Sequence, residues 1–335
     1  MFQTGPNLFL QSFASDTLTS VMVGISAMGD ETFFALALAI VIFGVSFTRG
    51  FLLLQLLLWS ALLNSALKDA FALPRPVHVD ARVLNDSALN ATPFTSMGAT
   101  SFFAAPPPDV VEKVRAVVPP GFDDYGFPSG HAQSTTVLWG SAAHLWDTPA
   151  IRRLAPFVIL MMAVSRMYLG RHFLADVLGG AVLGALVVVA LALARRRGWE
   201  TPLFDRSGTA LRAALPNAAI WLLLILAPLA VITYYPGRGG AMLGIGAGFL
   251  AVMRRGAPDD GGTRGQRAER VGIALLLYAA ASGVLALAVG VLGLDDRATW
   301  VTVVSKGVPS FLMTWGTVAA ARRAGLYRGH PEAGR

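Results

Sequence analysis

The chain has 335 residues, of which 54% are hydrophobic and only 14% are charged, against about 25% in soluble domains. This balance excludes a soluble enzyme and a disordered chain, and the lack of cysteine excludes disulfides, thiol catalysis and thiolate metal sites. The formal net charge is +7, but the 27 basic residues lie in short clusters between apolar runs, so no nucleic-acid partner is expected.

The first 31 residues carry no Lys or Arg, whereas a secretory signal peptide begins with basic residues, so no signal peptide is expected. Apolar side chains recur near helical spacing from Leu8 to Met28, and Asp16 interrupts them. This pattern predicts that residues 1–30 form an amphipathic helix lying at the membrane surface. A short first membrane span is the alternative.

Nine apolar runs follow, and a bilayer-spanning helix needs about 20 apolar residues. Several runs are shorter than this, and a short span can thin the bilayer or extend into its flanking loops. The runs cover Thr32–Phe47, Phe51–Leu67, His131–Trp146, Ile151–Val164, Leu174–Ala194, Ala213–Tyr234, Ala241–Met253, Val271–Leu292 and Trp300–Ala321. The sequence therefore predicts an all-α, polytopic membrane bundle of about nine spans.

The distribution of basic residues predicts the orientation of these spans. With the amino end outside, 17 of the 27 basic residues fall in inner segments and 10 in outer segments, as the positive-inside rule requires. The Arg-, Ala- and Gly-rich composition is typical of a bacterial chain. We therefore expect the protein to lie in the bacterial inner membrane, with its outer segments facing the periplasm. The longest outer segment, about 69–127, is a loop whose length favours a functional role or disorder.

Three residue clusters fall on the predicted outer face. The first runs from Lys68 to Pro76 (KDAFALPRP), the second from Phe127 to Ser134 (FPSGHAQS), and the third from Ser165 to Asp176 (SRMYLGRHFLAD). Each has an ordinary explanation alone: an interfacial anchor, a helix start, or a surface His–Asp pair. Their occurrence together at one face favours a common site.

The clusters combine cations, histidines and one carboxylate. Cations and backbone donors at a helix amino terminus suit an oxyanion with two negative charges, while a histidine beside a carboxylate suits nucleophilic or acid–base chemistry. The candidate residues are Lys68, Arg75, Ser129, Gly130, His131, Arg166, His172 and Asp176.

The complete pattern resembles the membrane-bound type 2 phosphatidic acid phosphatase superfamily, which includes glucose-6-phosphatase and vanadium haloperoxidases. The pattern has three parts. In the first, six residues separate Lys68 from Arg75-Pro76, and the second is Pro128-Ser129-Gly130-His131. In the third, five residues separate Ser165-Arg166 from His172, and three more separate His172 from Asp176. The resemblance covers roughly residues 30–198. The apolar runs and this resemblance together predict three parts: an interfacial helix over 1–30, a lipid phosphatase core over 31–198, and an additional transmembrane region over 199–335.

The resemblance also implies a role for each residue. His172 would attack phosphorus and become a phosphohistidine, with Asp176 orienting it. His131 would protonate the leaving alcohol and then activate water. Lys68, Arg75 and Arg166, with Ser129 and Gly130, would bind the phosphoryl oxygens. Because fixed cations can stabilise phosphoryl transfer, no metal or other cofactor is expected.

We therefore expect a hydrolase that acts on a lipid phosphate monoester or diphosphate at the outer face. Its candidate substrates are undecaprenyl diphosphate, phosphatidylglycerophosphate, phosphatidic acid and sphingoid-base phosphates. Two alternatives remain open: a phosphotransferase that uses the same intermediate, and a non-enzymatic lipid transporter or binding protein. Lys306, in the last run, is either an interfacial anchor or a ligand for an acidic headgroup; His78, His144 and His330 are expected to be non-catalytic.

Overall fold

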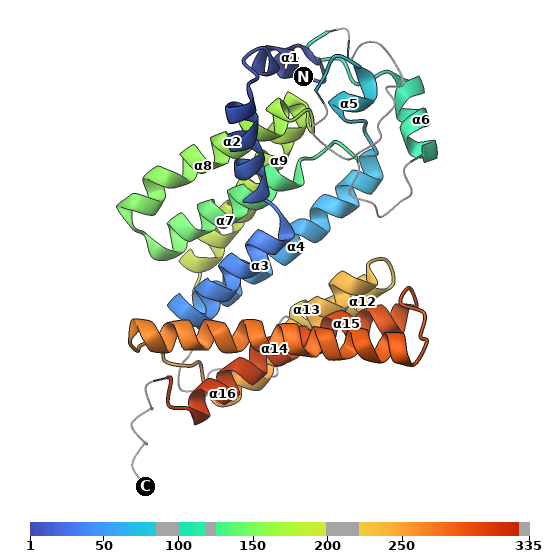
Figure 1. Ribbon diagram of the computed structural model, residues 1–335. Helices are drawn as coiled ribbons and strands as arrows, with labels where there is room; N and C mark the ends of the chain where they lie inside the picture. The colour runs from blue at the N-terminus through green and yellow to red at the C-terminus, as the bar shows by residue number, and fades with distance from the viewer. Residues whose placement is uncertain (85–98, 100, 118–124, 199–220, 328–335) are drawn as a thin grey trace. The chain divides into compact units, whose positions relative to one another are not determined.

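The computed structural model describes residues 1–84, 99, 101–117, 125–198 and 221–327 (Figure 1). These residues form helices and loops, and no strand occurs among them, which confirms the all-α class. The chain divides into two compact units. The first contains Met1–Ala35 and Leu53–Leu193, and the second contains Leu36–Leu52 and Ala194–Arg335.

The first unit contains the three clusters. Helices α3 (Glu31–Ala39) and α4 (Phe47–Phe71) contribute residues to both units, as does α9 (Leu174–Arg196), whose last three residues belong to the second unit. The other helices of the first unit are α1 (Gly5–Gln11), α2 (Asp16–Ala27), α5 (Pro76–Val79), α6 (Pro108–Val117), α7 (Gly130–Trp146) and α8 (Pro149–Tyr168).

The predicted single helix from Leu8 to Met28 is wrong, because the structure has α1 and α2 in its place. Ser15 starts the second helix: its hydroxyl accepts a hydrogen bond from the Leu18 backbone N–H at 3.2 Å. Asp16 follows in the first turn, where a carboxylate interacts favourably with the helix dipole. The chain therefore breaks at a serine cap that the apolar periodicity did not indicate.

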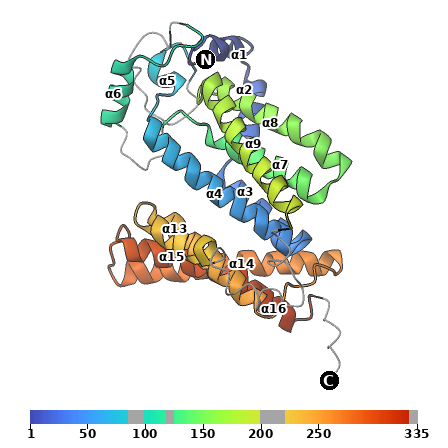
Figure 2. The same ribbon diagram turned by 180° about the vertical axis from the view of Figure 1, so that it is seen from behind.

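Helices α7, α8 and α9 lie side by side in both views of the ribbon (Figures 1 and 2). Glycines let α9 approach α7 closely. A Cβ at Gly180 would collide with the Ser129 carbonyl oxygen, and a Cβ at Gly184 would lie 2.7 Å from the Gln133 carbonyl oxygen. This close packing places the start of α9 against the start of α7, where the second and third clusters lie.

The second unit contains the described helices of the carboxyl-terminal region. Its helical segments are η1 (Ile40–Val45), η3 (Leu222–Leu226), α12 (Ala227–Ile232), α13 (Pro236–Met253), α14 (Arg264–Val291), α15 (Thr299–Phe311), η4 (Leu312–Gly316) and α16 (Thr317–Arg323). Helices α13 and α15 pack together, and a Cβ at Gly244 would collide with the backbone of Gly307. Small residues at this contact let the two backbones approach, as in many membrane helix pairs.

The predicted count of nine spans is supported only in part. Within the described residues, three segments are long and apolar enough to cross a membrane: Phe47–Val79, Leu174–Arg196 and Arg264–Val291. A fourth would combine α2 with Glu31–Val45, a pair bent by 57°. The run at His131 forms α7, which has 17 residues, and residues 213–220 of the Ala213–Tyr234 run lie outside the described part. The count of nine stays a prediction.

Candidate active site

The first cluster lies at the carboxyl end of α4 and in the loop that follows. The Lys68 ammonium is buried and donates a hydrogen bond to the Tyr125 carbonyl oxygen at 2.9 Å. Ala72 has φ of 47°, a left-handed conformation that redirects the chain after the helix. Arg75, also buried, precedes α5, and its backbone N–H donates to His78 Nδ1 at 3.1 Å. His78 therefore supports the backbone at Arg75, a contact absent from the sequence prediction.

The second cluster starts α7. The Ser129 side chain caps this helix by accepting a hydrogen bond from the Ala132 backbone N–H at 3.4 Å. The Ser129 backbone N–H donates to the Asp176 carbonyl oxygen at 2.9 Å, which joins this cluster to the third one. Gly130 is the first residue of α7, so it lies where a helix presents its unpaired N–H groups.

A buried amide network supports the start of α7 from α4. The Asn64 side-chain amide donates to Gln133 Oε1 at 2.8 Å and to the Pro128 carbonyl oxygen at 3.3 Å. The Gln133 amide in turn donates to the Ser60 carbonyl and hydroxyl oxygens, both at 2.8 Å. These contacts tie the second cluster to the helix that ends in the first.

The third cluster occupies the end of α8, the following loop and the start of α9. His172 and Asp176 are buried, and His172 Nδ1 lies 3.3 Å from Asp176 Oδ2. The same carboxylate oxygen accepts a hydrogen bond from the Phe173 backbone N–H at 2.9 Å. Gly170 has φ of 67°, which a glycine adopts without strain where the chain leaves α8. The predicted His–Asp pairing is thus present in the structure.

Cations from the first and third clusters act on His172. Burial lowers the pKa of His172 well below its usual value, and the positive charges of Arg75, Arg166 and Lys68 lower it further. The imidazole is consequently neutral at pH 7, the form that has a lone pair for nucleophilic attack. The structure therefore brings the cations of the first and third clusters around this histidine.

Arg166 is buried and contacts the last turn of α2. One of its terminal nitrogens donates to the Ser26 hydroxyl, while its Nε has no hydrogen-bond partner among the described residues. A buried, unpaired guanidinium N–H is costly unless a ligand satisfies it. Arg166 thus retains a donor for an oxyanion.

His131 lies at the first turn of α7 and contacts a residue that sequence reasoning missed. Its Nε2 is 3.0 Å from Asp30 Oδ1. The imidazole is partly exposed and the carboxylate is exposed. Gly29, beside Asp30, leaves room for the ring, because a Cβ there would collide with it. The Gly29–Asp30 turn is 101 residues from His131, so no local pattern could reveal the pairing.

Helix α1 holds the loop of the third cluster in place. The buried Asn7 amide donates to the carbonyl oxygens of Met167, at 2.8 Å, and His172, at 2.9 Å. The Gln11 amide donates to the Tyr168 carbonyl oxygen at 2.7 Å. The polar residues of α1 thus support the backbone of His172, a function that its sequence gave no signal for.

No group of three or more His, Cys, Asp or Glu side chains within the described residues could hold a metal ion. Apart from Asp176, the charged groups that act on His172 are cations, which suit an anionic ligand.

Residues 49–200 match the family model of the PAP2 superfamily. This segment is similar to proteins of the PAP2 superfamily. All eight predicted site residues lie within it. Comparisons with curated proteins and with solved structures gave no match for the chain. The PAP2 match supports a phosphoric ester hydrolase as the class of activity.

Proposed function

We propose that this protein hydrolyses a lipid phosphate monoester or diphosphate through a phosphohistidine at His172, without a metal ion. The observation that carries the proposal is a buried His172 paired with Asp176 and surrounded by the cations of Lys68, Arg75 and Arg166. Phosphoryl transfer depends mainly on positioning and on stabilising charge at the phosphoryl oxygens. Three fixed cations provide that charge from the protein itself.

In the first step, His172 Nε2 attacks phosphorus and the bond from phosphorus to the leaving oxygen breaks. Asp176 accepts a hydrogen bond from the Nδ1–H, which directs Nε2 toward the substrate and stabilises the charge that develops on the ring. His131 donates its proton to the leaving oxygen, so an alcohol departs, or a phosphate when the substrate is a diphosphate.

In the second step, the neutral His131 takes a proton from water as that water attacks the phosphohistidine. The phosphorus–nitrogen bond breaks, inorganic phosphate leaves, and both histidines return to their starting states. We infer that Asp30 is a positioning residue in this cycle. Its carboxylate lies 3.0 Å from His131 Nε2 and would orient the ring that acts as the acid.

A lipid substrate is proposed because the site lies in a chain with helices apolar enough to cross a membrane. The substrate's hydrocarbon chain would stay in the bilayer while its phosphate reaches the cations. Purified protein should release inorganic phosphate from at least one of the four candidate lipid phosphates, in buffer containing EDTA. Loss of activity in EDTA that returns on adding a divalent metal would contradict the metal-independent mechanism.

The proposed site faces the outside of the membrane, a prediction that labelling can test because the chain lacks cysteine. Ser101, in the predicted outer loop, and Gly265, in a predicted inner segment, are both exposed. In right-side-out inner-membrane vesicles, a membrane-impermeant thiol reagent should label Ser101→Cys and leave Gly265→Cys unlabelled. Detergent should expose Gly265→Cys to the reagent, and the reverse labelling pattern in intact vesicles would overturn the orientation.

A further inference from the structure

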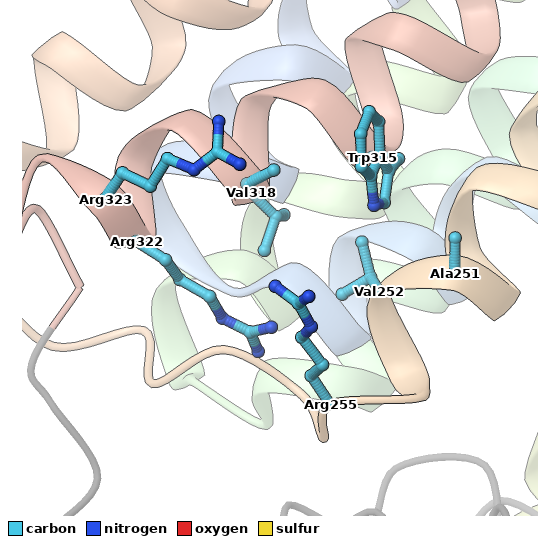
Figure 3. Close-up of a pocket in the computed structure, with 8 residues that line it drawn as sticks. Ala251, Val252, Arg255, Trp315, Val318, Arg322 and Arg323 are labelled. Carbon is cyan, nitrogen blue, oxygen red and sulfur yellow. The ribbon is translucent and has the colours of Figure 1, made fainter.

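Three arginines line one cavity in the second unit, outside the segment that matches the PAP2 superfamily. The cavity has a volume of about 250 Å³. A water molecule occupies about 30 Å³ in the liquid, so this space can hold a small polar headgroup but no whole lipid. The lining consists of Arg255, Arg322 and Arg323 with Ala251, Val252, Trp315, Val318 and Ala319 (Figure 3).

The arginines come from the ends of two helices. Arg255 follows α13, whereas Arg322 and Arg323 end α16. The half-buried Arg322 is held in place, because its Nη2 donates to the Gly256 carbonyl oxygen at 2.6 Å. Figure 3 shows the guanidinium groups of Arg255 and Arg322 directed toward each other. The cavity therefore has a cation held by a hydrogen bond, Arg322, and an exposed cation, Arg255, beside it.

The charge of this cavity is unbalanced. Its described lining contains no carboxylate. None of the three arginines forms an ion pair with Asp or Glu in the part of the chain that the structure describes. Other arginines are paired: Arg82 with Asp80 at 2.8 Å and Arg152 with Asp147 at 3.0 Å. Like charges around one space repel each other, and a bound anion would offset that repulsion.

We propose that this cavity binds a phosphate group, with its oxygens between the guanidinium groups of Arg255 and Arg322. Guanidinium groups bind phosphate through paired, charge-assisted hydrogen bonds, and basic pockets between membrane helices bind anionic headgroups. The apolar wall formed by Trp315, Val252 and Val318 could contact the glycerol or first methylenes of a lipid. A free phosphate would use the same cations without that wall.

Binding of phosphatidylglycerol to the purified full-length protein, measured by native mass spectrometry, tests the proposal. This lipid is a phosphodiester, so a phosphatase for monoesters and diphosphates would not consume it. The double variant Arg255→Gln with Arg322→Gln should bind it at least about tenfold more weakly. The matched control, Arg254→Gln with Arg264→Gln, removes the same charge from exposed residues outside the cavity and should bind as the original protein does.

Two further measurements assign the ligand. If millimolar inorganic phosphate displaces the lipid from the original protein, the site accepts free phosphate. If the lipid is retained, the site selects a phosphate that is attached to the glycerol or first methylenes of a lipid. Should the double variant fail to fold, Arg255→Gln alone repeats the test, because Arg255 is exposed. Equal weakening in the cavity variant and the control, or no weakening in either, would overturn the proposal. Phosphatase activity is not needed for any of these readouts, so failure here is distinct from failure of the proposed function.

Discussion

We expect His172→Ala to abolish turnover of every lipid phosphate that the protein hydrolyses. The rate should fall by about 10⁴-fold or more, because the variant removes the nucleophile from a group of residues that act together. His172 is 2% exposed, so its replacement by alanine leaves a buried cavity. The measurement is steady-state release of inorganic phosphate from the best substrate found in the lipid screen.

A matched control separates loss of chemistry from loss of fold. His144 lies in the last turn of α7, away from the three clusters, and His144→Ala should keep the original rate. His172→Ala should also elute as the original protein does in size-exclusion chromatography. Residual hydrolysis within tenfold of the original rate in a folded His172→Ala protein would contradict the proposed nucleophile.

His131→Ala should show a loss that depends on the leaving group. With a lipid alkoxide as the leaving group, the rate should fall by about 10²- to 10⁴-fold, the usual contribution of a general acid. With p-nitrophenyl phosphate, whose leaving group needs little protonation, the variant should carry out the first step, the attack of His172 on phosphorus, at close to the original rate. The ratio of the two rates, measured for original protein and variant, is the diagnostic quantity.

Asp30→Asn should change the ratio of the lipid rate to the p-nitrophenyl phosphate rate in the same direction as His131→Ala does. The change should be smaller, because the exposed carboxylate of Asp30 interacts through solvent-screened charge. Asp30→Glu, which keeps the charge, should restore the ratio toward that of the original protein. If Asp30 only shapes the turn between α2 and α3, Asp30→Asn would slow both substrates equally. An unchanged ratio in His131→Ala itself would remove His131 from the role of acid.

The sequence predicted the helices more accurately than their ends. Long apolar runs, such as the one that forms α9, specify a helix through composition alone. The break between α1 and α2 depends on a single side-chain cap at Ser15, which interrupts an otherwise continuous periodicity. Likewise, the run at Thr32–Phe47 continues from α3 into the π-helical η1 before α4 begins, a backbone change that apolar residues do not signal.

The site itself was predictable where its residues share a local pattern. His172 and Asp176 are four residues apart, so helical geometry alone brings them close, and Ser129 and Gly130 mark a helix start. Asn7 and Asp30 were missed, because their partners lie more than 100 residues away in the chain. Contacts of this kind depend on how α1 and the α2–α3 turn pack, which no spacing within one segment records.

The central claim is a covalent phosphohistidine at His172, and trapping that intermediate tests it most directly. Purified protein is mixed with substrate, quenched in alkali after a short time because phosphohistidine is labile in acid, and digested for mass spectrometry. The account predicts a phosphoryl group on the peptide that contains His172. With p-nitrophenyl phosphate as substrate, its occupancy should be higher in His131→Ala, because water attack is slowed while the first step is largely spared. A phosphoryl group on another residue, or an unchanged level of phosphoenzyme in His172→Ala, would contradict the account.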